Sequence, residues 1–141
     1  KMSDYTPDRW ILIKVVSKEG EILYKVFGNW YGGYAGSDEW RFSSGVTKVI
    51  ECDKHYEVHN HSGSVYTCYK NSKGMSAYGA GVFQNLQKQL SDKDMGTMKI
   101  VYDFAEQHSD KGYEIGSLEE AEAFAKKRNY TFEVAPDERT N

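Results

Sequence analysis

The sequence predicts a single α+β domain in which two helices from the C-terminal half pack on one face of an antiparallel sheet. In the first half of the 141-residue chain, short segments rich in β-branched and aromatic residues alternate with glycine or serine turns. Helical spacing of apolar residues begins only after these segments, and strands followed by helices are typical of α+β domains. A chain of this length can close a hydrophobic core without disulfides.

The first half is expected to be a meander of five or six short strands. The segments RWILIKVVS and EILYKVFG flank a short turn that ends in Gly20, and this is the clearest hairpin signal in the chain. The first of these two segments is apolar on both faces, and such a strand is usually central or covered by helices. The expected strands are residues 9–17, 21–28, two within 40–52 that flank a Ser-Ser-Gly turn, 55–59 and 64–70, followed in the second half by 97–104 and 130–134.

Two helices are expected in the second half. Apolar residues at helical spacing place the first over residues 82–90. Ser76 is a candidate N-cap, but Gly79 and Gly81 weaken the first turn, so a late start is expected. The second helix is expected over residues 117–128, where a capping-box pattern precedes an apolar face and the charges complement the helix dipole.

Composition and charge exclude several classes of function. The formal net charge of −3 contains no basic excess, which argues against general nucleic-acid binding. No apolar run is long enough to span a bilayer and no signal peptide is visible, so a cytoplasmic protein without membrane contact is expected. Cys52 and Cys68 lack CxxC spacing and are expected to be free thiols, although strand neighbours can pair. Residues 1–8 and 136–141 are expected to be flexible ends of the single domain 1–141, and edge strands could pair two copies.

Three of the four histidines, His55, His59 and His61, lie close together in the sequence. Their spacing matches no zinc pattern, and a turn after His59 should send His61 away, so neither a metal nor another cofactor is expected. His61 precedes Ser62, but this serine is not in a GxSxG elbow, and sequence neighbours rarely supply triad geometry. A small phosphoesterase-like hydrolase that uses His61 with a neighbouring hydroxyl or a metal remains the alternative function.

A ligand- or partner-binding surface is the leading interpretation. Residues 29–40 alternate large aromatic residues with glycines, and this segment is expected to be a loop or an irregular edge. Aromatic rings offer flat faces to a base or a peptide, and the arginine that follows could clamp a phosphate or carboxylate. The turn Ser62-Gly63-Ser64 can present amides and hydroxyls to an anion. The candidate binding residues are Trp30, Tyr31, Tyr34, Trp40, Arg41, His61, Ser62, Ser64 and Tyr66.

These residues suit a small nucleotide-like anion and a protein partner equally, since Trp, Tyr and Arg are the usual interface anchors. The competing interpretation is that Trp30 and Trp40 are core residues under an irregular loop. Residues 74–81 lead into a helix whose unsatisfied amides favour an anion, but they lack the lysine and the spacing of a P-loop.

Two stretches, NWYGGYAGSDEWRFSSGVTKV and HNHSGSVYTCYKNSKGMSAYGAG, resemble a group of small accessory proteins of tailed phages. The resemblance covers roughly residues 20–85 and brings no catalytic motif with it. It implies a protein that acts in the host cytoplasm against host defence or regulation, by binding a host protein or a nucleotide signal. With this resemblance, we expect a non-enzymatic binding protein that antagonises a host defence system.

Overall fold

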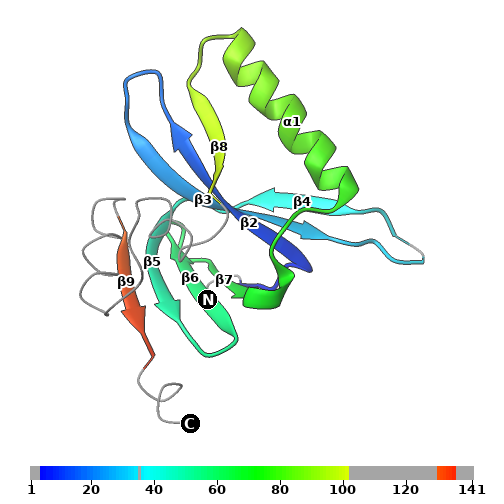
Figure 1. Ribbon diagram of the computed structural model, residues 1–141, viewed down its shortest axis with the longest axis vertical. Coiled ribbons are helices and arrows are strands. Elements are labelled where there is room, and N and C mark those ends of the chain that lie inside the picture. The colour runs from blue at the N-terminus through cyan, green and yellow to red at the C-terminus, as the bar shows by residue number, and fades with distance from the viewer. Residues whose placement is uncertain (1–3, 35, 102–129, 136–141) are drawn as a thin grey trace.

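The computed structural model describes residues 4–34, 36–101 and 130–135, which form two β-sheets and one α-helix (Figure 1). A short 3₁₀ helix, Lys70–Ser72, precedes the α-helix α1, which spans Ala77–Asp92. The strands are β1 (Asp4–Tyr5), β2 (Arg9–Val16), β3 (Ile22–Trp30), β4 (Glu39–Phe42), β5 (Val46–Glu51), β6 (His55–Asn60), β7 (Val65–Tyr69), β8 (Thr97–Val101) and β9 (Thr131–Val134).

The strands divide between two sheets, so the expected single antiparallel sheet is wrong. The central sheet has the order β4-β3-β2-β8 and is antiparallel throughout. The outer sheet has the order β1-β7-β6-β5-β9 and is mixed, because β1 runs parallel to β7 and β9 runs parallel to β5. The turn at residues 43–45 was expected to join strands of one meander, but it carries the chain from the central to the outer sheet.

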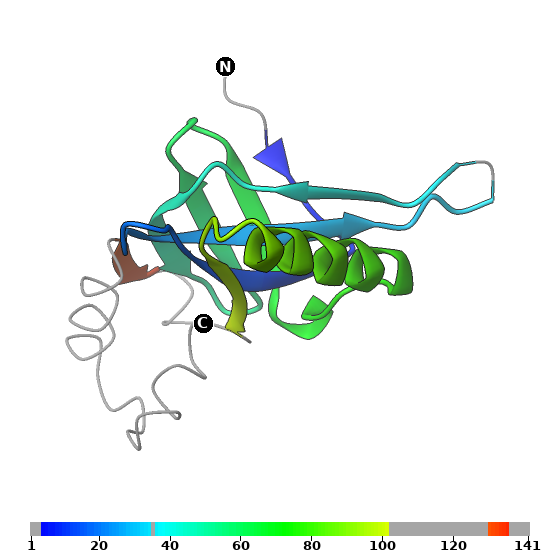
Figure 2. The ribbon, with the colours of Figure 1, turned by 90° about the horizontal axis from the view of Figure 1, so that it is seen from above.

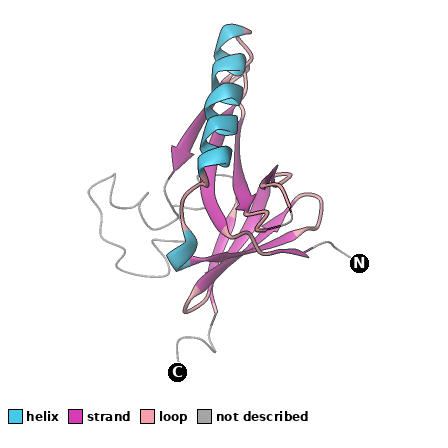
Figure 3. Ribbon diagram, turned by 90° about the vertical axis from the view of Figure 1, so that its right-hand side faces the viewer, coloured by secondary structure: helices cyan, strands magenta, loops and turns pink. Residues whose placement is uncertain are grey.

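The central sheet is the middle of three layers. On β2, Trp10 and Leu12 belong to the core that the central sheet shares with the outer sheet, whereas Ile11 and Ile13 belong to the core beneath α1. Alternate residues of a strand point to opposite faces, so β2 is buried on both sides. The strand was expected to be central or covered by helices, and it is central, with α1 over one face and the outer sheet over the other. Figure 3 shows α1 running along the central sheet, away from the outer sheet.

The two sheets cross. Near the start of β3, Tyr24 contacts Tyr130, the residue before β9, with ring centroids 5.7 Å apart. At the end of β3, Trp30 contacts Tyr5 of β1, with ring centroids 6.2 Å apart. Because β9 and β1 are the two opposite edges of the outer sheet, β3 spans that sheet from edge to edge, which is the geometry of orthogonal sheet packing.

The helix α1 begins at Ala77 rather than at the expected residue 82. Ser76 is the N-cap, and its hydroxyl accepts a hydrogen bond from the Gly79 amide at 2.9 Å. A side chain at Gly79 would meet β3, because its Cβ would lie 1.9 Å from Oδ1 of Asn29. The glycine that was expected to delay the helix therefore lets its first turn lie directly on the central sheet.

Several expectations fall outside the described residues. These are the second helix at residues 117–128, the last part of the strand expected at 97–104, and the chain ends 1–3 and 136–141. Within the described part, α1 is the single α-helix, where two helices were expected. Residues 4 and 5, part of the segment 1–8 that was expected to be a flexible end, form the edge strand β1.

Candidate functional site

The β3–β4 hairpin projects from the body of the protein (Figure 2). The residues expected to begin and end a loop are strand residues, since Asn29 pairs with Trp40 and Trp30 pairs with Glu39. The large aromatic residues at both ends suit a pleated strand, and only the glycine-rich middle leaves it. The expectation of a loop is therefore wrong at both ends of residues 29–40, whereas the alternative of an irregular edge agrees with β4, the edge strand of the central sheet.

Trp40 and Arg41 lie on opposite faces of β4, because side chains alternate along a strand. The Trp40 indole packs toward the α1 side, with ring centroids 6.0 Å from Phe27 and 5.8 Å from Phe42. The Arg41 guanidinium lies on the outer-sheet side, with Cζ 4.8 Å from the centroid of the Tyr5 ring. These sequence neighbours therefore belong to two different surfaces.

Tyr5 gathers three of the candidate residues into one cluster. Its ring lies 4.9 Å from the Tyr66 ring and 6.2 Å from the Trp30 ring, and it carries the Arg41 guanidinium on its face. The Trp30 indole nitrogen donates to the Thr6 carbonyl at 3.2 Å, which holds the chain beside β1 in place. We call Tyr5, Trp30, Arg41 and Tyr66 the Tyr5 cluster. Sequence reasoning missed Tyr5, because nothing local shows that this short polar segment pairs with β7.

The Tyr5 cluster joins a buried phenol to an exposed cation. Burial raises the pKa of Tyr66, and the nearby Arg41 charge only partly opposes this effect, so the phenol stays protonated at neutral pH. Within the described residues, the Arg41 guanidinium has no carboxylate partner and contacts the Tyr5 ring. The cluster is thus an aromatic and cationic patch, with Tyr66 beneath it in the core between the sheets.

The backbone amides of the turn from His61 to Ser64 all have hydrogen-bond acceptors. The His61 amide donates to the Gly45 carbonyl at 2.9 Å, and the Ser62 amide donates to the Ser44 hydroxyl at 2.9 Å. The two remaining amides donate to groups within the hairpin itself. The Gly63 amide donates to the Asn60 carbonyl, and the Ser64 amide donates to the Ser62 hydroxyl. Because each amide already has an acceptor, the turn offers an anion its hydroxyls but no free N–H group.

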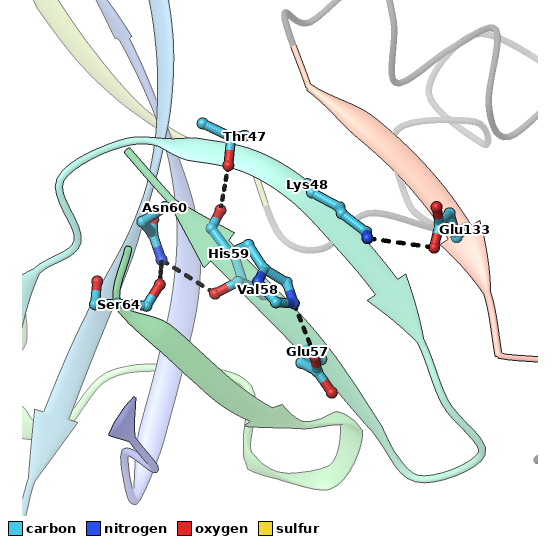
Figure 4. Close-up of polar contacts among 8 residues, drawn as sticks. All are labelled: Thr47, Lys48, Glu57, Val58, His59, Asn60, Ser64 and Glu133. Carbon is cyan, nitrogen blue, oxygen red and sulfur yellow. Dashed lines mark hydrogen bonds and ion pairs between the residues drawn. The ribbon is translucent and has the colours of Figure 1, made fainter. Parts of the chain in front are cut away.

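The three neighbouring histidines have different surroundings. Figure 4 shows His59 turned toward Glu57, with Nε2 2.7 Å from a carboxylate oxygen, while Asn60 turns toward Ser64. The His55 ring packs on Tyr69, with centroids 5.6 Å apart. The His61 ring lies beside Gly45, whose Cβ would come within 2.8 Å of it. In the part of the chain that the structure describes, no three His, Cys, Asp or Glu residues are grouped to hold a metal ion.

The hydroxyl groups near His61 do not form a nucleophile–base pair with it. The Ser62 and Ser64 hydroxyls are 3.0 Å apart and hydrogen-bond to each other. Across residues 4–34, 36–101 and 130–135, neither serine is hydrogen-bonded to the His61 ring. A hydrolytic role for His61 would therefore need a substrate to bring these groups together.

No protein-family model, characterised protein or solved structure matches this chain. None of the described helices combines the length and the apolar character needed to cross a bilayer.

Proposed function

We propose that this protein is a non-enzymatic binding protein that docks on another protein through the projecting β3–β4 hairpin. The observation that supports it is the exposure of the hairpin's aromatic side chains. Tyr34 is 106% exposed, Tyr31 is 54% exposed and Trp40 is 37% exposed. Tyrosine and tryptophan gain much contact area at little entropic cost, and they are the residue types that anchor protein interfaces.

The shape of the hairpin favours a protein partner over a small ligand. Sites for small ligands are concave and bury most of the ligand surface, whereas this hairpin stands out from the body (Figure 2). A projecting hairpin can instead enter a groove on a partner. The polar turn at residues 61–64, the other half of the expected surface, has its amides already paired.

The Tyr5 cluster extends this surface on the other face of β4. Its exposed Arg41 offers a charge-assisted contact beside the aromatic hairpin, and Arg is enriched in interfaces for this reason. The resemblance to accessory proteins of tailed phages suggests that the partner is a host protein of defence or regulation, met in the host cytoplasm. Sequestration of a nucleotide-like signal is the alternative that the experiment below separates.

The test is capture of a partner from a bacterial lysate by the tagged full chain, followed by mass spectrometry of bound proteins and of small molecules released by heat. The hairpin variant is Tyr31→Ala/Tyr34→Ala. The matched control, Tyr69→Ala/Tyr78→Ala, removes two tyrosines that are 41% and 50% exposed on other elements. We expect the hairpin variant to lose a specific partner that the control keeps, with unchanged thermal unfolding of both.

Retention of the same partner by the hairpin variant would contradict this mode of docking. Release of a nucleotide from the wild-type chain, with no protein partner, would support sequestration instead. Trp40 is a less discriminating position for this test, because its indole packs on Phe27 and Phe42 and its loss would disturb the fold as well as the surface.

A further inference from the structure

Arg9 and Asn29 lie side by side under the beginning of α1. They are paired directly across β2 and β3, so both side chains are on the face of the central sheet that α1 covers. Asn29 holds the helix start, since its Oδ1 accepts from the Ser76 amide at 2.8 Å and from the Ser76 hydroxyl at 3.2 Å. The Arg9 guanidinium lies against Gly74, where a Cβ would come within 2.6 Å of Nη2.

Both side chains carry a buried hydrogen-bond donor without a partner. Asn29 is fully buried, and its Nδ2 has no acceptor among the residues that the structure describes. The Nε of Arg9 is likewise buried and unpaired, and its guanidinium has neither a hydrogen bond nor an ion pair within the described residues. The adjacent carboxylate of Asp8 accepts from the Tyr31 amide instead. Buried donors in native proteins are nearly always satisfied, so two neighbouring unpaired donors indicate a missing acceptor.

The first turn of α1 adds further donors of the same kind. Ser76 caps the Gly79 amide, but the amides of Ala77 and Tyr78 precede any intrahelical acceptor. They lie at the positive end of the helix dipole, where anions are favoured. This place therefore gathers hydrogen-bond donors from three sources: the first amides of α1, the side-chain amide of Asn29 and the guanidinium of Arg9. The guanidinium also carries a full positive charge.

We propose that this place is a binding site for a phosphate-type oxyanion, either free phosphate or a phosphate monoester. A water molecule could satisfy the donors, but only an anion also balances a half-buried guanidinium that lacks a carboxylate. Because Arg9 is only partly buried, an anion can reach its side chain from solvent. The site is separate from the aromatic tip of the hairpin, so its occupancy does not depend on the proposed protein docking.

The deciding experiment is a titration of the ¹⁵N-labelled full chain with inorganic phosphate, and with sodium chloride at equal ionic strength. We expect saturable shifts of the amides of residues 76–79 with phosphate alone. No shift, or the same shift with chloride, would overturn the site. A parallel titration with 5′-AMP distinguishes the two sources, since tighter binding than phosphate identifies a monoester and equal binding identifies free phosphate.

Two variants test the residues. Arg9→Gln should weaken phosphate binding by about tenfold or more, whereas Lys99→Gln, which removes an exposed cation of β8, should leave it unchanged. Asn29→Asp keeps an acceptor for Ser76 but places a carboxylate beside Arg9, so it should abolish the phosphate shifts even if Arg9→Gln fails to fold. Wild-type affinity in a folded Arg9→Gln or Asn29→Asp variant would refute the assignment.

Discussion

The guanidinium of Arg41 lies 4.8 Å from the centroid of the Tyr5 ring, and this contact joins the edge strands of two different sheets. Tyr5 is on β1, which is only two residues long and, among the described strands, pairs only with β7. Backbone pairing of that length holds a strand weakly, so the ring contacts of Tyr5 hold β1 in place. In return, β1 pairs with the first two residues of β7 and shields that part of the strand from pairing with another chain.

The energy of this contact can be measured by a double-mutant cycle. Tyr5→Leu removes the ring and Arg41→Met removes the charge but keeps the stem. We expect a coupling of about 0.5–1 kcal/mol in the free energy of unfolding, the usual value for an exposed cation–π pair. Urea unfolding of the four proteins gives the coupling. The control is a cycle of Tyr5→Leu with Lys99→Met, which removes a cation on β8, and its two effects on stability should be additive. If the effects of Tyr5→Leu and Arg41→Met are also additive, the contact between these two residues does not contribute to stability.

Alanine substitutions at two glycines of α1 should change the stability of the fold in opposite directions. At Gly79 a Cβ would lie 1.9 Å from Oδ1 of Asn29, so Gly79→Ala should destabilise the fold by about 1–3 kcal/mol through overpacking. At Gly81 a Cβ would meet nothing within 4 Å, so Gly81→Ala should stabilise it by about 0.5–1 kcal/mol through helix propensity.

Thermal and urea unfolding of the two glycine variants decides the comparison. If both substitutions stabilise the protein to the same extent, the first turn of α1 does not lie on Asn29. That outcome would also remove the basis for placing an anion site there.

Local patterns predicted most of the strands, because each strand and hairpin turn depends on neighbouring residues. On this basis the structure confirms the strands expected at residues 9–17 and 21–28, and the antiparallel pairing of the strands expected at 55–59 and 64–70. The division into two sheets depends on distant contacts instead. Where β4 ends, the Val26 amide of β3 donates to the Ser43 hydroxyl at 2.9 Å, and this contact between residues 17 apart leaves no signal in the local pattern. The parallel pairings of β1 with β7 and of β9 with β5 also join residues far apart in the sequence.

The candidate site was predictable only in part, for a related reason. Aromatic residues such as Tyr34 are conspicuous in a sequence, and their exposure can be expected near glycines. Asn29 looked like the first residue of a loop, and Arg9 like the polar end of a strand. Their shared position under α1 follows from the register of β2 on β3 and from the approach of Gly79, neither of which is encoded by residue type alone.

Alkaline pH should unfold the protein through groups that are protonated when buried. Burial raises the pKa of the Cys68 thiol well above its usual value, and it raises the pKa of Tyr66 in the same direction. Both groups then ionise more readily in the unfolded chain, so their contribution to stability is complete below the unfolded pKa values of about 8.5–10 and is lost as pH rises. For the fully buried Cys68, the loss approaches about 1.4 kcal/mol per pH unit.

The measurement is urea unfolding of the wild type and of Cys68→Ala and Tyr66→Phe between neutral pH and the alkaline limit of the fold. Cys68→Ala should be less stable than the wild type at neutral pH, because it leaves a small cavity, whereas Tyr66→Phe keeps the ring and should change stability little. Since neither variant can lose a proton at the substituted group, the stability of each variant relative to the wild type should rise with pH. Stability curves that stay parallel across this range would show that these groups do not link the fold to pH.

Slow reaction of the Cys68 thiol with a disulfide reagent in the folded protein, and rapid reaction in urea, would confirm independently that its burial is the cause.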